Sequence, residues 1–176
     1  MTTKQFSRII KDRKLFASIL LIIVGIFILV HDLLRDKVKS KAELIEIQST
    51  LRDYSFIENK GFRRHIIDFQ ITLDDYEPNF KIIADFADYF NRNLFERTVI
   101  AGDTLRVFIS KRDYLNIDRK QKIKTFGIYK NNTTFLNLEQ SIAQDNNDLL
   151  MYSGLFFLFI GIMIFNRNKN KLRTEK

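Results

Sequence analysis

The residues whose types could support catalysis or metal binding are few, and their spacing argues against both. The two histidines, His31 and His65, stand far apart, and no HExxH pattern of a zinc hydrolase is present. The acidic residues Asp74, Asp75 and Glu77 precede the single proline in a predicted turn. They lack the spacing of an EF-hand loop, so a solvated turn is favoured over a calcium site.

No other catalytic constellation is evident. The sequence contains no cysteine, which excludes disulfides, thiolate metal sites and thiol catalysis. A GxSxG nucleophile elbow and a glycine-rich phosphate loop are also missing. His65 begins a predicted strand. A histidine there could act as a pH-sensitive group, but a structural histidine with a hydrogen-bond partner is the favoured interpretation. We therefore expect no cofactor and no enzyme activity, with a hydrolase that uses Asp74, Asp75 or His65 as the minor alternative.

One basic stretch is the most suggestive polar feature of the central region. It comprises Arg119, Lys120, Lys122 and Lys124. Exposed cations of this density can meet acidic headgroups, cell-wall polymers or an acidic protein surface. The alternative is a solvated loop whose charges are balanced by nearby acids.

The overall charge of the chain points to membrane topology rather than to nucleic acid. The formal net charge is +8, but each terminal tail holds five basic residues and one acidic residue, which leaves the region between them neutral. A nucleic-acid footprint would instead place the basic residues on one face of the folded domain. We expect no nucleic-acid partner.

Two apolar runs adjoin these tails and predict membrane helices. The first spans 15–34, with no charge between Leu15 and Val30, and the second spans 149–165. At 1.5 Å per residue, each uncharged run gives about 25 Å of helix, close to the roughly 30 Å hydrocarbon core of a bilayer. A cleaved signal peptide is the alternative for the first run, but no small-residue cleavage site follows it.

The flanking charges predict the orientation of these helices. The tails 1–14 and 166–176 are basic and are expected to be cytoplasmic, which places residues 39–147 outside. Arg35, Lys37, Lys39 and Lys41 weaken this signal after the first helix, although long loops translocate largely regardless of charge. The composition, rich in Asn, Lys, Ile and Phe, favours a bacterial cytoplasmic (inner) membrane.

Small residues recur at heptad spacing in both apolar runs. Ser18 and Gly25 share one helix face, and Gly154 and Gly161 share another. Small residues let helix backbones approach closely, so these four predict a helix–helix contact within one chain or between chains of a homo-oligomer. The alternative is that glycine is simply common in membrane helices.

The region 39–147 is predicted to be mostly β-structure. Polar and apolar residues alternate over 44–51, 67–73, 79–83 and 104–110, and two further strands are predicted over 125–130 and 133–138, between which Asn131 and Asn132 predict a type I′ hairpin turn. The alternation changes phase after Leu51, which indicates a bulge or bend. Phe86, Phe90 and Leu94 recur at helical spacing after a possible N-cap at Asp85.

The expected fold class is an α+β membrane protein. Two transmembrane helices flank a small, mostly antiparallel β barrel or sandwich, OB-like, with one short helix. The alternation of residues does not decide between a barrel and a sandwich.

A resemblance supports this architecture. The segments AGDTLRVFISKRD and FGIYKNNTTFLNLE, placed between two apolar helices, resemble a group of small, uncharacterised bacterial two-helix envelope proteins with an OB-like β insert. The resemblance covers residues 15–165 and implies the fold without implying any catalytic residue.

The sequence thus predicts a non-catalytic accessory subunit of an envelope protein complex. It has the lipid bilayer and a membrane or envelope protein as partners. An extracytoplasmic module that binds or senses a lipid, a cell-wall polymer or a toxin is the alternative.

Overall fold

The structure is a computed structural model that describes residues 13–60 and 65–174; side chains are described for 13–58 and 67–169. The chain forms two compact units. One comprises the residues up to Asp36 together with those from Asn147 onward, and the other is Lys37–Asn146. We call them the helix pair and the β domain and describe each by itself.

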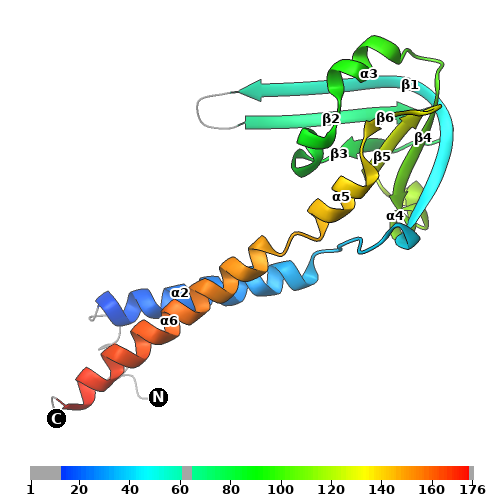
Figure 1. Ribbon diagram of the computed structural model, residues 1–176. Coiled ribbons are helices and arrows are strands. Elements are labelled where there is room, and N and C mark those ends of the chain that lie inside the picture. The colour runs from blue at the N-terminus through cyan, green and yellow to red at the C-terminus, as the bar shows by residue number, and fades with distance from the viewer. Residues whose placement is uncertain (1–12, 61–64, 175–176) are drawn as a thin grey trace. The chain divides into compact units, whose positions relative to one another are not determined.

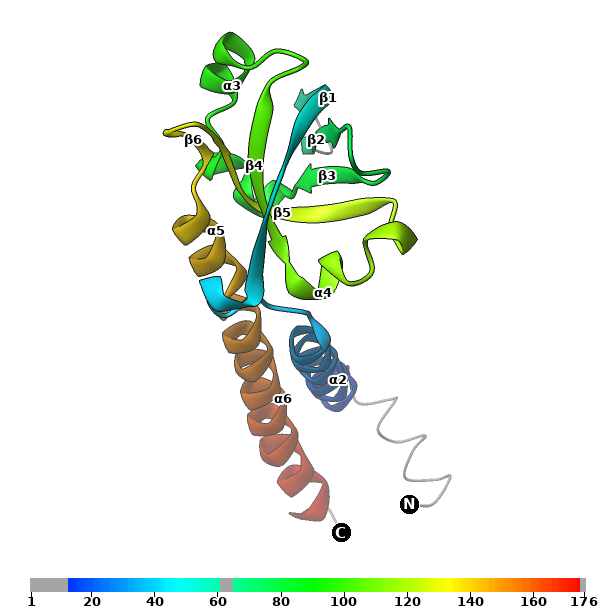
Figure 2. The same cartoon turned by 90° about the vertical axis from the view of Figure 1, so that its right-hand side faces the viewer.

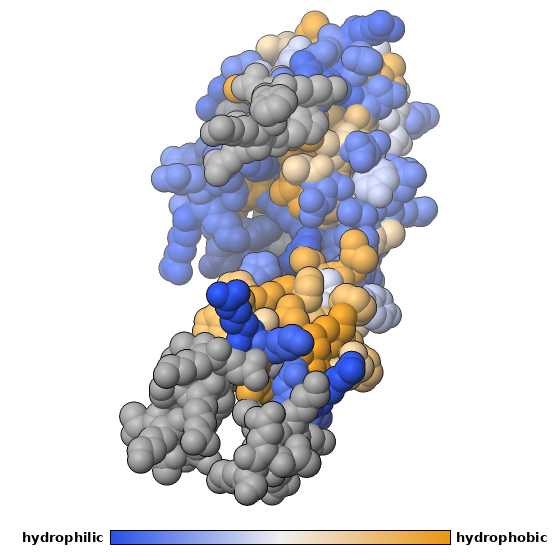
Figure 3. Space-filling model, turned by 90° about the vertical axis from the view of Figure 1, so that its left-hand side faces the viewer, coloured by the Kyte–Doolittle hydropathy of each residue, from blue (hydrophilic) through white to orange (hydrophobic). Residues whose placement is uncertain are grey.

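The helix pair consists of α2 (Arg13–Leu34) and α6 (Leu149–Thr174), which pack along each other (Figure 1). Both contain an apolar stretch long enough to cross a membrane by length and composition. Apolar side chains gather over this unit, whereas polar side chains cover most of the visible β domain (Figure 3). α6 continues as helix past the predicted end at residue 165, into the basic tail.

The β domain is built on six strands, each close to a predicted alternating segment. They form one sheet in the order β3-β2-β1-β4-β5-β6, with neighbouring strands antiparallel. The strands are β1 (Leu44–Lys60), β2 (His65–Leu73), β3 (Asn79–Ile82), β4 (Thr104–Ser110), β5 (Lys122–Lys130) and β6 (Thr133–Leu136).

The first strand is long and changes partner along its length. Its first part pairs with β4, from Leu44 opposite Ser110 to Thr50 opposite Thr104. Its second part pairs with β2, and the register is irregular between Leu51 and Asp53. This is the position at which the sequence changes phase, so the predicted bulge or bend is found there.

An additional pairing joins β3 to β5, which lie side by side in Figure 2. The two strands are parallel, with Asn79 opposite Lys122 and Phe80 opposite Ile123. β3 therefore has two partners, β2 on one side and β5 on the other, and does not form a free edge of the sheet.

The prediction of one short helix is wrong, because the β domain contains several. Among its described residues are α3 (Arg92–Thr98), α4 (Lys111–Tyr114) and α5 (Leu138–Asp145). Three short 3₁₀ helices, at Lys41–Glu43, Ala84–Tyr89 and Ile117–Arg119, complete these segments.

The predicted helix around Phe86, Phe90 and Leu94 is interrupted. Phe90 forms an isolated bridge with Leu136, and the N–H of Asn91 donates to the carbonyl of Phe135, which pulls the backbone out of helical geometry. α3 then begins beyond this point, capped by the side chain of Asn91, which accepts from the N–H of Leu94. Asp85 is not its N-cap.

The β5–β6 turn also differs from its prediction. Lys130 pairs with Thr133 around the two asparagines, as expected for a two-residue hairpin. A type I′ turn needs positive φ at both central residues, yet among the described non-glycine residues only Asn131 has it, at 53°. That pattern of signs belongs to type II′.

Aromatic side chains fill the core between the sheet and α3. Phe56 lies 5.4 Å from Phe69, 5.1 Å from Phe90 and 5.3 Å from Phe95, measured between ring centroids. Phe95 in turn contacts Phe135 edge-on at 5.2 Å. Such edge-to-face contacts add to the stabilisation that burial of apolar area provides.

Candidate functional site

The helix pair brings together all four small residues singled out in the sequence. A Cβ atom placed on Gly25 would lie 2.8 Å from the backbone N of Leu158 and 2.9 Å from the carbonyl oxygen of Gly154. A Cβ on Gly161 would lie 3.0 Å from the carbonyl oxygen of Ser18. These distances are too short for a side chain, so glycine is what permits the close backbone approach of α2 and α6.

Ser18 is completely buried in this contact, and its hydroxyl donates to the carbonyl of Leu15 at 2.7 Å. Its polar atom is thereby satisfied within its own helix. Asp32, near the end of α2, is also buried, at 6% exposure. Sequence inspection missed its burial because no periodic signal distinguishes it from the polar residues that follow.

The basic stretch 119–124 does not form one uniform patch. Lys120 pairs with Asp113, and Lys124 pairs with the buried carboxylate of Asp145. The ammonium of Lys124 also lies 4.7 Å from the ring centroid of Phe126. Arg119 and Lys122 are exposed. Lys124 and Lys120 are therefore paired with acids of the domain, and Lys120 is exposed like Arg119 and Lys122.

Asp145 and Asn146 hold the beginning of the β domain to its end. Asp145, with no exposed surface, accepts the backbone N–H of Val38 at 2.9 Å. The amide of Asn146 donates to the carbonyl of Val38 at 2.7 Å and to that of Ile142 at 2.9 Å. We call Val38, Asp145 and Asn146 the clasp. Because its partners are more than a hundred residues apart, no local sequence pattern could have found it.

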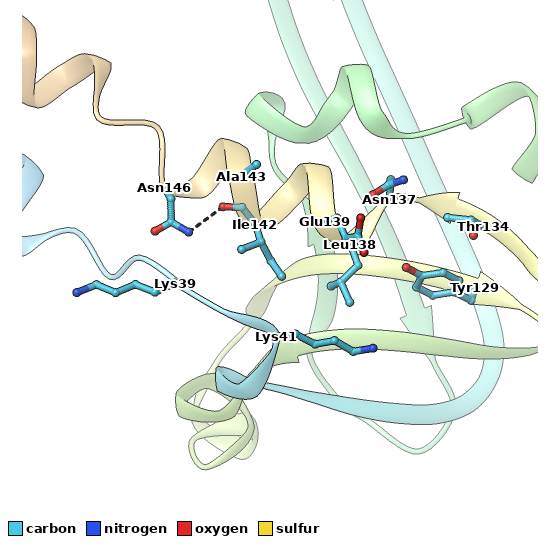
Figure 4. A pocket seen from close by; sticks show the side chains of 10 residues that line it. All are labelled: Lys39, Lys41, Tyr129, Thr134, Asn137, Leu138, Glu139, Ile142, Ala143 and Asn146. Carbon is cyan, nitrogen blue, oxygen red and sulfur yellow. Dashed lines mark hydrogen bonds between the residues drawn. The ribbon is translucent and has the colours of Figure 1, made fainter.

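A groove of about 670 Å³ lies between α5, the β5–β6 hairpin and the segment that precedes β1 (Figure 4). Its size falls within the range of small-molecule sites. The lining residues are Lys39, Lys41, Tyr129, Thr134, Asn137, Leu138, Glu139, Ile142, Ala143 and Asn146.

The groove has an apolar floor and a charged rim. Leu138 is 5% exposed and Ile142 is half-buried, whereas Lys39, Lys41 and Glu139 are exposed. Two cations beside a single carboxylate, over an apolar floor, suit a ligand with an anionic head and an apolar part. Asn137 caps α5 by accepting from the N–H of Gln140 at 3.1 Å, which fixes the helix that forms one wall.

The acidic turn before Pro78 is engaged within the domain. Asp74 pairs with Arg52 at 3.1 Å, and Asp75 accepts from the hydroxyl of Ser49 at 2.6 Å. In the part of the chain that the structure describes, no three His, Asp or Glu side chains cluster to hold a metal ion. His65 is the first residue of β2, and its side chain lies outside the described residues.

Among the described side chains of the β domain, three ionisable groups are shifted from their ordinary pKa values. Lys81, 3.0 Å from Asp68, lowers the pKa of that carboxyl against the opposing effect of burial. The N–H of Ile100 and the ammonium of Lys130 lower the pKa of Asp103. Burial, with smaller contributions from Tyr114 and Asp75, raises the pKa of Tyr76. All three lie outside the groove.

Comparisons with known proteins identify no relative. No family model, no curated protein and no solved structure matches the chain.

Proposed function

We propose that this chain is a two-pass membrane protein that presents its β domain to a protein complex of the bacterial envelope, as a non-catalytic accessory subunit. The observation that carries the proposal is the exposure of large apolar side chains around the helix pair. Phe27 is 70% exposed on α2, and Phe159 is 68% exposed on α6.

This exposure is unfavourable in water and favourable in lipid. Burial of apolar surface is worth about 25 cal/mol per Å², and monomeric soluble proteins rarely leave so large a contiguous apolar surface uncovered. The small residues meet between the helices while the large ones face outward, as in membrane bundles. The outward-facing set includes Phe16, Leu20, Ile23, Phe27, Leu33, Leu155, Phe156, Phe159, Ile162 and Met163.

The proposed orientation follows the positive-inside rule. Both basic tails lie in the cytoplasm, and residues 39–147 lie on the outer side of the cytoplasmic membrane.

The strand pairings support an OB-like barrel as the presented domain. β1 pairs with β2 and β4, and β3 pairs with β2 and β5, so a circuit β1-β2-β3-β5-β4-β1 returns to its starting strand. In OB folds the strands frame an outer surface and loops that bind ligands. A closed barrel would also remove exposed strand edges.

Gentle purification tests the accessory role. The tagged full-length protein is cross-linked in native membranes, extracted in mild detergent and analysed by mass spectrometry for proteins retained in stoichiometric amount. A membrane or envelope protein retained in this way supports the proposal. A chain recovered alone or only with copies of itself overturns it.

Charge reversal maps the partner-binding surface. Arg119→Glu combined with Lys122→Glu changes the two exposed cations of the basic stretch other than Lys120, which pairs with Asp113, and Arg97→Glu is the control at an exposed position elsewhere on the β domain. Loss of the partner in the double variant alone would place the interface at residues 119–122. Retention of the partner in both variants would exclude this stretch.

The groove favours a second candidate function, an extracytoplasmic module that binds a small amphiphile. Native mass spectrometry of the purified protein would then detect a bound molecule. Ala143→Phe fills the groove from an exposed lining position, and Gln140→Phe adds the same bulk to an exposed position of α5 outside the lining. A ligand lost only in the first variant supports the groove, whereas a ligand-free wild type contradicts this function.

A further inference from the structure

We propose that the loop after β4 docks on the anionic phospholipid surface of the bilayer that the helices cross, an inference that rests on the proposed membrane crossing. The docking loop comprises residues 111–119, from α4 to the following 3₁₀ helix. Its tip carries apolar side chains and its flanks carry cations, a combination that suits the boundary between headgroups and acyl chains.

The apolar tip is Leu115 with Tyr114. Leu115 is 82% exposed and Tyr114 is 39% exposed. Among the described residues of the β domain, Leu115 is the most exposed large apolar side chain; Ile100 follows at 71%. A single exposed leucine is common on soluble proteins and needs no explanation by itself. Two features distinguish Leu115 from an ordinary exposed leucine: the charges around it and its position in the domain.

Cations dominate the flanks of the tip. Lys111, Arg112 and Arg119 are all exposed. Of the two acids in the loop, Asp113 pairs with Lys120, and Asp118 is exposed. The exposed Lys111 and Arg119 thus present positive charge on both sides of Leu115, which complements an anionic lipid surface.

The conformation of the loop is held by its own hydrogen bonds. The hydroxyl of Ser110 caps α4 by accepting from the N–H of Asp113 at 3.0 Å. The N–H of Leu115 donates to the carbonyl of Lys111 at 3.0 Å, and the amide of Asn116 donates to that of Arg112 at 2.9 Å. Leu115 is therefore presented outward by an ordered turn, so docking orders little additional chain.

The loop lies at the end of the β domain where the chain arrives from α2. It begins directly after Ser110, which pairs with Leu44, the first residue of β1. α4 contacts β1 and lies near the start of that strand in both ribbon views (Figures 1 and 2). Val38 of the clasp follows the last residue of α2 by four positions, so this end of the β domain is the one that the chain enters from the helix.

Ile100 provides a matched position at the opposite end of β4. Ile100 precedes β4. The first residue of β4, Thr104, pairs with Thr50, whereas the docking loop follows the end of β4 that pairs with the start of β1. Seven strand residues span roughly 20 Å, about three times the thickness of a headgroup layer. Both Leu115 and Ile100 are highly exposed, so either accepts a larger side chain without disturbing the core.

A lipid surface fits the docking loop better than a protein does. A stable protein interface uses about 20–30 residues on each side, with an apolar core. Here the exposed apolar tip consists of two side chains, which suffice for shallow insertion but not for the core of such an interface.

Single tryptophans test the proposal because the chain has none of its own. Leu115→Trp reports on the docking loop, Ile100→Trp on the far end of the domain and Phe27→Trp on the exposed surface of α2. Each full-length variant is reconstituted into vesicles of phosphatidylcholine with phosphatidylglycerol. Tryptophan emission is compared with and without a lipid that carries a quenching nitroxide on its headgroup or a bromine pair in its acyl chain.

The proposal predicts that the headgroup nitroxide quenches the tryptophan at position 115. Brominated acyl chains should quench the tryptophan at position 27. Neither lipid should quench the tryptophan at position 100. If position 115 behaves like position 100 while position 27 is quenched, docking is overturned and the membrane crossing stands. If position 27 is not quenched, the membrane crossing itself fails. Quenching at positions 100 and 115 alike would also overturn docking through this loop.

A second comparison tests the role of charge. Lys111→Gln, Arg112→Gln and Arg119→Gln are combined, once in the Leu115→Trp background and once in the Phe27→Trp background. As a second change, the two tryptophan variants without these substitutions are reconstituted into vesicles of phosphatidylcholine alone. Both changes are expected to reduce quenching at position 115 and to leave it unchanged at position 27. Quenching at position 115 that is insensitive to both would overturn recognition of anionic lipid.

Discussion

The buried carboxylate of Asp145 accepts the backbone N–H of Val38 at 2.9 Å across a separation of 107 residues. It also pairs with Lys124 on β5, so one side chain links the beginning of the β domain, its last helix and its sheet. The adjacent Asn146 completes the clasp by donating to the carbonyl of Val38. Both connections to the helix pair thus leave the β domain from one place.

Removal of this carboxylate should destabilise the β domain. Asp145→Ala leaves the N–H of Val38 and the ammonium of Lys124 without their acceptor, and we expect a loss of about 2–4 kcal/mol in the free energy of unfolding. Urea titration of the detergent-solubilised protein, followed by near-ultraviolet circular dichroism, measures it. Gln140→Ala, at an exposed position of the same helix, should change the value by less than about 0.5 kcal/mol. Equal stability of both variants would contradict the structural role of the clasp.

The cations of the basic stretch should separate into two groups. Lys124→Glu places a second carboxylate beside buried Asp145 and should cost about 3 kcal/mol or more. Arg119→Glu with Lys122→Glu changes exposed positions and should alter the free energy of unfolding by less than about 0.5 kcal/mol. The same urea titration compares the Lys124→Glu variant with the double variant. Equal losses in the free energy of unfolding would mean that pairing with an acid does not distinguish Lys124 from Arg119 and Lys122.

The helix pair should not tolerate a side chain at Gly25. Gly25→Val would force atoms against the backbone of Leu158 and should weaken the contact by about 1–3 kcal/mol. Thermal unfolding of the helices in detergent, followed by far-ultraviolet circular dichroism, measures the change. Ala17→Val, at an exposed position of α2, is the control and should leave the unfolding midpoint unchanged.

The stability of the β domain should fall in acid. The pKa values of Asp68 and Asp103 are lowered in the folded state, chiefly by Lys81 and by the N–H of Ile100, respectively. The unfolded chain therefore takes up these protons first. Their contribution is present above the unfolded pKa of about 4 and is lost as the pH falls through the folded values.

Two substitutions test this linkage. Asp68→Asn and Asp103→Asn should each flatten the dependence of the unfolding free energy on pH below about 4, measured by urea titration at successive pH values. Glu139→Gln, which replaces an exposed carboxylate on α5, is the comparison. An unchanged slope in both asparagine variants would show that these ion pairs do not govern the acid response.

The proposed orientation predicts which residues are reached from outside the cell. A single cysteine at Lys122 should react with a membrane-impermeant maleimide in intact spheroplasts, because that position is exposed on the β domain. A cysteine at Lys4 should react only after permeabilisation. The native chain contributes no background, since it contains no cysteine. The reverse pattern would invert the topology.

Much of the sheet could be predicted from the sequence, because alternation records which face of a strand is buried. Leu105, Val107 and Ile109 alternate in the sequence, and all are fully buried in β4. The phase change after Leu51 coincides with the change of partner in β1. Strand pairing itself was not predictable, because the parallel contact of β3 with β5 depends on distant segments.

The short helices and the groove show where sequence reasoning stops. α5 was missed because it has only eight residues and begins at Leu138, inside a polar segment without sustained apolar periodicity. The groove needs α5 as one wall, so it could not be anticipated either. Lys39 and Lys41 were noted only as charges that weaken the topology signal, whereas the structure places them on the rim.

The change of partner along β1 also sets the order in which the domain can assemble during synthesis. The second part of β1 can pair with β2 almost at once, because only residues 61–64 separate the two strands in the sequence. The first part must wait for β4, about sixty residues later in the chain, and closure of so long a loop is entropically costly. Until then the edge at 44–50 stays open, which makes the nascent chain prone to pairing with other strands. The ribosome thus completes both strands of the β1–β2 pair long before β4 is available to pair with the first part of β1.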